Sequence, residues 1–492
     1  MPIHTIFRPT ALVFAVAVIG TGVSRAQLPG VSSAPAPSRN SQDSTPRIPA
    51  SMGPQGNQYL GSIPSGEATN EVIDLTIADA MARAVQYNLA LAETGEDIRE
   101  QRAERLRALS RLLPDITARP SVSEQQINLA AFGFTGFPGV PSVVGPFSIY
   151  DARAYLNQSI FNLQDLRNHR AAREQVAAAE FMARDVREQV ALISSGLYLI
   201  ALAGSSRVDA QRAQVATAEA VYKQASDRRA AGTVPGIDVL RAQVEFQSEQ
   251  QRLIYYEGEF EKQKLNLARA IGLPPGQQVR LTDHMRYEPV PPVIPIEPIL
   301  ATAYKQRADY QAAEASVRAA ELARSAAVAG RYPTATLDAN YGVIGPVPDH
   351  MHGTFAVSGT VNIPIFQGGR VQADVERADA ELRRRRAEFA DLRSRIDADV
   401  RTALTDLRSS SRQVEVAVKN VDLAKEQLQQ SQDRFAAGVT NNLEVVQAQQ
   451  AVALANENYI AALYSYAAAQ SALVRARGDA EKSITEYLRR TK

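Results

Sequence analysis

The sequence predicts a mainly α-helical protein with a small β part, in which long antiparallel coiled-coil helices are joined to four β-strands per chain. Three observations support this fold class. Residues 227–272 and 433–478 align without a gap, so that Asp227 meets Asp433 and Gly272 meets Gly478. Long stretches show an apolar residue every seven positions, and in short stretches between them apolar and polar residues alternate. The duplication has to be recognised first, because it sets the organisation of the whole chain.

Each duplicated stretch predicts a helical hairpin with a short tip. Gly232 and Gly438 end the first helix, because glycine most easily adopts the left-handed conformation after a helix C-terminus. Turn residues 233–236 and 439–442 follow, and the second helix starts with an acid in its first turn, Asp238 or Glu444. Such an acid stabilises the helix dipole by roughly 0.3–1 kcal/mol, which is a purely structural alternative to a functional role.

Apolar heptads predict that these hairpins are coiled coils. A seven-residue apolar repeat forms a packing seam between helices, although one such run alone also fits an ordinary amphipathic helix. Three runs around duplicated tips favour the coiled coil. The repeating residues are Val400, Leu407, Val414, Val421, Leu428 and Phe435 before the second tip, Val446, Ala453, Ile460, Ala467 and Val474 after it, and Val239, Phe246, Leu253, Phe260 and Leu267 in the first copy.

The N-terminus predicts export. Residues 1–26 form a secretory signal peptide, with Arg8 before a short apolar core at 11–20 and small residues before Gln27. This core is shorter than the roughly 18–20 residues of a membrane-spanning helix, and no other stretch is expected to form one. Residues 27–70, rich in Pro, Ser and Gly, predict an extended lead-in. With no cysteine and a net charge of +1, the sequence argues against thiolate metal sites and nucleic-acid binding.

Each copy also contains a shorter helix that ends at a proline. Residues 75–113 predict a helix with Thr76 as N-cap, Asp79 three residues later, and either a bend or a weak point in the polar segment 93–97. Residues 296–331 repeat this unit, so that Pro114 aligns with Pro333. Both helices are predicted to stop at these positions, because proline cannot continue the helical hydrogen-bond ladder.

Two-residue alternation after each proline predicts four strands, each with one polar and one apolar face. Their lengths suit tilted membrane-spanning strands. A sheet that crosses lipid must close, and barrels use at least about eight strands, so four strands per chain would require several chains in one barrel. Two soluble hairpins remain the alternative that alternation alone leaves open. The predicted strands are residues 115–122, 147–161, 334–341 and 354–363.

Two proline-free stretches, 162–231 and 370–437, predict very long helices. About 70 helical residues span roughly 105 Å, which is far longer than a globular domain. The returning helix 237–272 covers only the half nearer the tip, and the helix 75–113 has the length to cover the other half. Each copy is therefore predicted to be a long helix flanked by two shorter helices stacked end to end.

The chain resembles the TolC-like outer-membrane efflux protein family over residues 71–478. The matching motifs are the opening LTIADAMARAV, the helix-to-strand breaks LLPDI and RYPTA, the segment NIPIFQGG, and two tips of the form G-x5-[DE]-V-[LV]-x-A-Q. The resemblance implies a homotrimer with a twelve-stranded barrel in outer-membrane lipid and a helical tunnel through the periplasm. It also implies two partners, a periplasmic membrane-fusion adaptor and an inner-membrane transporter.

The family's tip motif is an adaptor-docking and gating region. The resemblance therefore implies that role for Gly232, Asp238, Val239, Gly438, Glu444 and Val445. The sequence departs from some family members in lacking an N-terminal lipidated cysteine. The two tips also differ from each other, because the first has Pro235 and Gly236 where the second has Asn441 and Asn442, so they need not contact a partner equally.

No residue constellation predicts catalysis, so we expect no enzymatic activity and no cofactor. His350 and His352 lie in the loop between the third and fourth predicted strands. Two imidazoles can bind a metal, but a loop pair without a third ligand is a weak site, and no metal is predicted.

The function predicted is an outer-membrane exit duct of a tripartite efflux or type I secretion system, passively conducting its cargo from the periplasm to the exterior. The alternative is a soluble periplasmic coiled-coil interaction protein. An exit duct need not recognise its cargo, so no cargo is predicted. The predicted divisions are the signal peptide at 1–26, the lead-in at 27–70, a first repeat at 71–281, a second repeat at 294–480 and a C-terminal tail at 481–492.

Overall fold

The computed structural model describes residues 58–134, 139, 141–291, 294–440 and 442–479. All of them belong to one compact unit. The predicted signal peptide, most of the lead-in and the C-terminal tail lie outside the described residues, so those predictions remain predictions.

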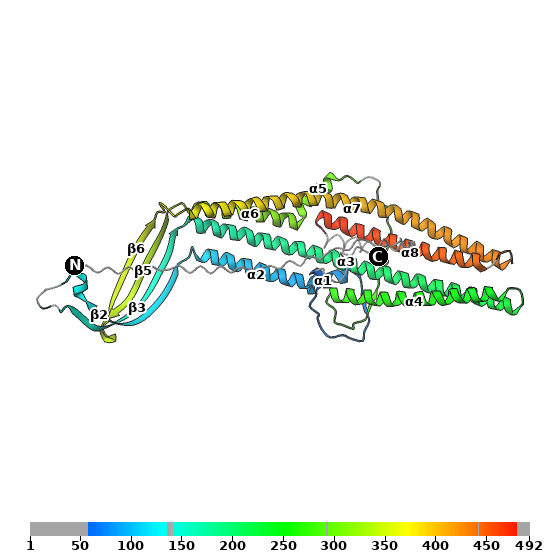
Figure 1. Cartoon of the computed structure of the whole chain (residues 1–492), viewed down its shortest axis with the longest axis horizontal. Coiled ribbons are helices and arrows are strands. Elements are labelled where there is room, and N and C mark those ends of the chain that lie inside the picture. Colours follow the sequence, from blue (N-terminus) through cyan, green and yellow to red (C-terminus); the bar gives the residue numbers. More distant parts are fainter. Residues whose placement is uncertain (1–57, 135–138, 140, 292–293, 441, 480–492) are drawn as a thin grey trace, which may run out of the picture. The chain divides into compact units, whose positions relative to one another are not determined.

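Two long helices run through the described part of the chain (Figure 1). Helix α3 covers Leu163–Ala230 and helix α7 covers Arg370–Ala436, which confirms both predicted lengths to within about one turn. Each reverses into a shorter antiparallel helix, α4 at Gly236–Ala270 and α8 at Asn442–Arg477. The predicted helical hairpins are therefore confirmed.

Each predicted helix before a proline is two helices. Helix α1 (Ile77–Tyr87) and helix α2 (Leu89–Ser110) meet at Asn88, and helix α5 (Glu297–Gln306) and helix α6 (Ala308–Ala329) meet at Arg307. Asn88 is extended, and its side chain accepts a hydrogen bond from the Ala90 backbone N–H at 2.9 Å, so that it starts a new helix. The bend predicted at 93–97 is wrong, because the break lies at Asn88 and 93–97 is helical.

Four antiparallel strands follow the prolines in the order β2-β3-β5-β6. They are β2 (Asp115–Asn128), β3 (Val143–Phe161), β5 (Thr334–Gly345) and β6 (His352–Asn362). All four predicted strands are confirmed, and β2, β3 and β5 are longer than predicted. Strand β3 pairs with β5, so one sheet joins the two copies. Short 3-10 turns cover Gln58–Leu60, Leu129–Phe132 and Pro348–His350.

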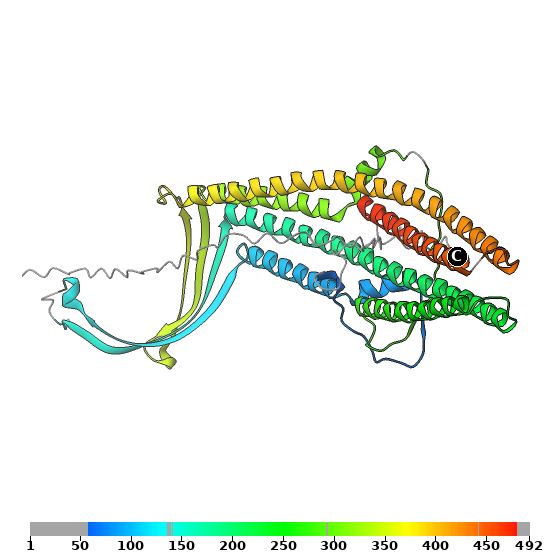
Figure 2. The ribbon, with the colours of Figure 1, turned by 45° about the vertical axis from the view of Figure 1, so that its right-hand side comes forward.

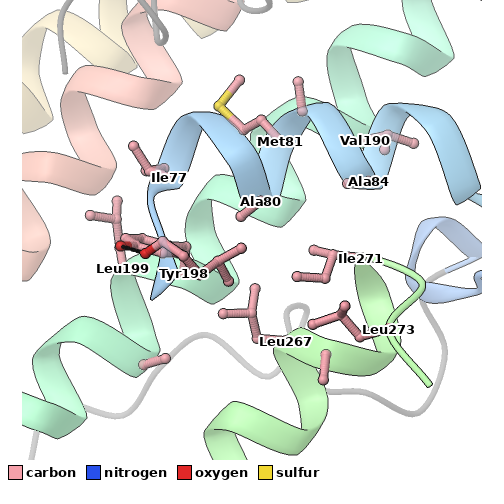
Figure 3. Packing of buried hydrophobic residues seen from close by; sticks show 14 of the residues in the cluster. Ile77, Ala80, Met81, Ala84, Val190, Tyr198, Leu199, Leu267, Ile271 and Leu273 are labelled. Carbon is pink, nitrogen blue, oxygen red and sulfur yellow. Dashed lines mark hydrogen bonds between the residues drawn. The ribbon is translucent and has the colours of Figure 1, made fainter. Parts of the chain in front are cut away.

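A second, two-stranded sheet was not predicted. Strands β1 (Ile73–Leu75) and β4 (Val279–Leu281) pair in parallel beside a core formed by α1, the middle of α3 and the end of α4 (Figure 3). Tyr198 is fully buried there, and its hydroxyl donates to the Leu75 carbonyl at 2.8 Å and lies 2.9 Å from Asp283. These contacts fix the chain segments at both ends of the first copy to α3.

Helices of the second copy pack against the first copy more extensively than the sequence predicted. Helix α6 packs against both α3 and α7, whereas its counterpart α2 packs against α3 alone among the long helices (Figures 1 and 2). Helix α8 likewise contacts both α7 and α3. The picture of one long helix flanked by its own two short helices is therefore incomplete, because two of the second copy's helices also cover the first copy's long helix.

Helix α3 corrects the expectation that no stretch after the signal peptide is long and apolar enough to form a membrane-spanning helix. Its length and composition would allow it to cross a membrane. More than half of its most apolar stretch is buried, however. This apolar composition is explained by the core in Figure 3, where Val190, Tyr198 and Leu199 pack against neighbouring segments.

Candidate functional site

Both tips end their first helix in the same backbone motif. Gly232 and Gly438 have φ values of 73° and 74°, in the left-handed region that glycine favours. In the first tip the backbone N–H of Gly232 donates to the carbonyl of Arg229 at 2.9 Å, and the backbone N–H of Thr233 donates to the carbonyl of Arg228 at 2.9 Å. The second tip repeats this pair of bonds. This is the Schellman arrangement, so the predicted role of both glycines in ending the helices is confirmed.

The two tips are joined by hydrogen bonds to backbone carbonyls. The Arg228 guanidinium at the end of α3 donates to the carbonyls of Phe435 at 2.7 Å and Ala436 at 2.9 Å, at the end of α7. Its guanidinium carbon also lies 4.8 Å from the centre of the Phe435 ring. In the opposite direction, the Asn442 amide donates to the Asp238 carbonyl at 3.2 Å. A cation at a helix C-terminus is favourable, so Arg228 stabilises the end of α7 as well as the contact.

A small apolar cluster lies beneath these hydrogen bonds. It includes Val445, which is fully buried, and Val239, which is partly buried, so both predicted valines contribute to packing between the tips. The other members come from both hairpins and are Val221, Ala225, Ala242 and Phe435, with Tyr222 and Leu428 at the margin. The cluster makes the two tips one packed contact.

The two predicted acids have different surroundings. Asp238 is only 7% exposed, lies 3.6 Å from the Arg241 guanidinium, and is covered where the tips meet. Glu444 is half-buried, lies 3.3 Å from the Arg434 guanidinium, and accepts a hydrogen bond from the Thr440 hydroxyl. The structure therefore brings all six predicted tip residues into one region, with Glu444 more accessible than Asp238 within the chain.

Arg228 and Asn442 are tip residues whose roles sequence reasoning missed. The alignment of the two copies pairs Arg228 with Arg434 and Asn442 with Gly236, so it placed both residues in the tips without indicating their contacts. Their contacts run between hairpins about 200 positions apart, and no local pattern predicts which hairpin faces which.

A second buried contact joins the copies near the middle of α3. Arg475 of α8 lies between two acids of α3, with its guanidinium 3.0 Å from Glu188 and hydrogen-bonded to Asp185. Arg307, at the α5–α6 junction, binds Asp309 at 2.7 Å and Asp399 at 3.1 Å. Burial raises the pKa of Glu188 to about 7 and raises the pKa of Asp185, although Arg475 opposes both shifts. No sequence pattern indicated this cluster, because its members are widely separated along the chain.

The remaining candidate residues are exposed. His350 lies 3.2 Å from Asp349, and His352 starts β6. Within the described residues no group of three or more His, Cys, Asp or Glu side chains is placed to hold a metal.

Comparison with known proteins identifies the family. The sequence profile described as "Outer membrane efflux protein" matches residues 80–273 and 299–479. The pyoverdine export outer membrane protein OpmQ of Pseudomonas aeruginosa is 24% identical over 388 residues, covering 77% of this chain and 79% of the relative. The toluene efflux pump outer membrane protein TtgF of Pseudomonas putida is 24% identical over 421 residues, covering 84% and 85%.

Solved structures show the same fold. The CmeC outer membrane channel of Campylobacter jejuni superimposes with a TM-score of 0.72 at 16% identity, covering 89% of this chain and 96% of that one. The outer membrane protein VceC of Vibrio cholerae gives a TM-score of 0.70 at 18% identity, covering 82% and 96%. Together with the duplicated hairpins and the four-stranded sheet, the profile match over most of the chain establishes that this protein belongs to the outer membrane efflux protein family.

Proposed function

We propose that three copies of this outer-membrane efflux channel close their sheets into one twelve-stranded barrel, and that their helices form a tunnel through the periplasm. The trimer acts as the passive exit duct of a tripartite system. A periplasmic membrane-fusion adaptor docks on the helical tips, and an inner-membrane transporter supplies the energy.

The register of the sheet is the observation that supports this assembly most strongly. Opposed residues across all four strands form rows of like polarity. One row contains Ile116, Leu156, Ala339 and Val357, and a row on the opposite face contains Asp115, Asn157, Asp338 and Ser358. Such a sheet suits a cylinder with lipid on its apolar face and water on its polar face.

The edges of the sheet support closure with other chains. Strands β2 and β6 are the outer strands, and each pairs on one side only within the described residues. Unpaired backbone groups cannot be satisfied in lipid, so β6 of one copy has to pair with β2 of the next. Four strands from each of three copies give a barrel of ordinary size for outer-membrane proteins.

The tips provide a surface for the adaptor. Ile237, Val439 and Leu443 are large apolar residues that are 51%, 69% and 44% exposed beside the predicted tip residues. Large exposed apolar residues at the end of a helical structure suit a protein partner. Glu444 adds a half-buried acid at the same end. The soluble periplasmic alternative no longer stands, because the family is located in the outer membrane.

Conductance in a planar lipid bilayer tests the proposal. The full-length protein, purified in detergent and added to one side, should produce discrete ion-conducting steps without any added nucleotide or cofactor. A variant that inserts charge in the apolar rows, Val357→Asp, should lose insertion, whereas Ser358→Asp on the opposite face should retain it. Absence of conducting steps from the wild-type protein would refute the channel assembly.

A further inference from the structure

The two strand hairpins of the four-stranded sheet differ in length. Strand β3 pairs with β5 only as far as Tyr150, which lies opposite Gly345 at the end of β5. Beyond that pair, β2 and β3 continue together as a two-stranded overhang formed by residues 123–128 and 143–149 (Figure 2). The seven residues 143–149 extend about 23 Å past the end of β5. Among the described residues, no third strand pairs with this overhang.

The face that we propose to contact lipid becomes polar where the overhang begins. In β3, Ala152 and Tyr150 are followed on this face by Ser148. In β2, Val122 is followed on the same face by Glu124. A carboxylate on the lipid side of a barrel is unfavourable, so the apolar band ends at Tyr150 and Val122. The overhang therefore extends beyond the hydrocarbon layer.

The opposite face, which lines the inside of the proposed barrel, changes in the other direction. Arg153 and Asp151 are followed on this face by Ile149 and Phe147. The pairing of β2 with β3 is regular from Arg153 to Phe147, so these alternate residues share one face. Strand β5 places Ile344 opposite Asp151 on the same face. The inner face is thus polar within the membrane and apolar at its outer end.

This apolar inner face needs a cover that its own chain does not supply. Ile149 and Phe147 are only half-buried. A two-stranded hairpin is marginally stable in water unless one of its faces packs against something. Lipid lies on the other side of the sheet, and the surface across the barrel axis is the same face of the other copies.

The dimensions allow the overhangs to meet. Twelve strands spaced about 4.8 Å apart and tilted by about 40° form a barrel with a radius of about 12 Å. The overhang, at about 23 Å, is longer than this radius. An overhang that leans inward can therefore reach the axis of the barrel.

We propose that the overhangs of three copies lean over the outer mouth of the barrel and pack Ile149 and Phe147 against one another around its axis. This inference rests on the proposed function and adds to it a contact outside the membrane. The duct then has a constriction at its outer end, at the opposite end of the protein from the helical tips.

Cross-linking of one residue to itself tests whether the overhangs meet. Full-length protein carrying Ile149→Cys, which has no other cysteine, is treated in outer membranes with a short thiol-reactive cross-linker that contains a reducible bond. We expect covalent dimers. On an upright barrel wall, identical residues of two copies would be about 21 Å apart, beyond the reach of such a reagent. Ser148→Cys, on the opposite face, is the matched control and should give little product.

Conductance of the cross-linked protein tests the effect on the duct. Cross-linked Ile149→Cys channels should conduct at least twofold less than before treatment, because the overhangs are then held together across the exit. Reduction of the cross-linker should restore the current. Ser148→Cys channels treated in the same way should be unchanged.

Tryptophan fluorescence tests lipid as the alternative cover. The chain has no tryptophan, so each substitution gives a single signal. In vesicles of brominated phospholipid, Val357→Trp should be quenched strongly, because Val357 is 64% exposed on the lipid face. Ile149→Trp should be quenched at least threefold less. Equal quenching would place Ile149 in lipid and overturn the contact.

The outcomes separate this inference from the proposed function. Each variant is first checked for conductance and for the mass of three chains, and Phe147→Cys replaces Ile149→Cys if the latter does not insert. Conducting trimers without a cross-link at either position would overturn the contact at the mouth and leave the channel intact. Equal cross-linking at position 148 would do the same. A wild-type protein that neither trimerises nor conducts would overturn both.

Discussion

The two copies meet at the tips and again near the middle of α3, and these contacts differ in their chemistry. At the tips, Arg228 and Asn442 bind backbone carbonyls over a small apolar cluster. In the middle, Arg475 lies between the buried Asp185 and the partly buried Glu188, beside a large apolar core. Separation of the middle contact would leave buried charges without partners, whereas the tip groups could turn to water. The comparison indicates a fixed middle contact and separable tips.

Loss of Arg475 should produce the largest effect. Arg475→Leu leaves the buried Asp185 without its cation, so we expect a destabilisation of about 3–5 kcal/mol. The measurement is thermal unfolding followed by circular dichroism, with Arg477→Leu as the control because Arg477 is exposed on the same helix. Equal melting temperatures for the two variants would show that the middle contact is not an anchor.

Loss of Arg228 should produce a moderate effect that is confined to the tips. Arg228→Ala removes two charged hydrogen bonds to the end of α7, which should weaken the contact by about 1–2 kcal/mol. The tips should then separate more often and raise the mean single-channel conductance. Lys223→Ala, at an exposed position five residues earlier in α3, should behave like the wild type. Unchanged conductance in Arg228→Ala would mean that this arginine does not hold the tips together.

Titration of Glu188 should make stability depend on pH. Its pKa is raised from 4.5 to about 7, so the folded protein holds this proton more tightly than the unfolded chain. Proton binding by Glu188 contributes fully to the free energy of unfolding below pH 4.5, and this contribution is lost as the pH rises through about 7. Over that interval the free energy of unfolding should fall by roughly 1 kcal/mol per pH unit. Glu188→Gln should flatten this part of the profile of melting temperature against pH. A wild-type profile that rises between pH 5 and pH 7.5 and is unchanged by the substitution would contradict the assignment.

Replacement of the acids at the tips, Asp238 and Glu444, should have the smallest effect on stability. Replacement of either one by alanine costs about 0.3–1 kcal/mol through the helix dipole. Cation preference, measured as a reversal potential in a salt gradient, should fall more for Glu444→Ala than for Asp238→Ala, because Asp238 is covered by the second tip. If the double variant keeps the conductance, cation preference and pump activity of the wild type, neither acid acts in conduction.

Features that depend on local chain chemistry were predicted well from the sequence. Helices α3 and α7 end two residues before Gly232 and Gly438, and strands β2 and β5 begin directly after Pro114 and Pro333. These glycines and prolines constrain their own backbone, so their effect can be predicted locally. The capping box at Thr76 and Asp79 is also present as predicted.

Features that depend on distant contacts were missed. The junction at Asn88 needs the Tyr59 carbonyl, to which the Asn88 amide donates, and Tyr59 lies 29 residues earlier. Strand β1 needs its partner β4 from the other end of the first copy. The placement of Arg475 between Asp185 and Glu188 depends on how one copy packs on the other, which heptads alone do not determine.

The mass of the conducting particle is the most direct test of the central claim that duplicated units of several chains surround one pore. The full-length protein should be purified in detergent and its protein mass determined by light scattering with detergent subtraction. We predict the mass of three chains in the same fraction that gives single-channel conductance. A conducting particle with the mass of one chain would contradict the account.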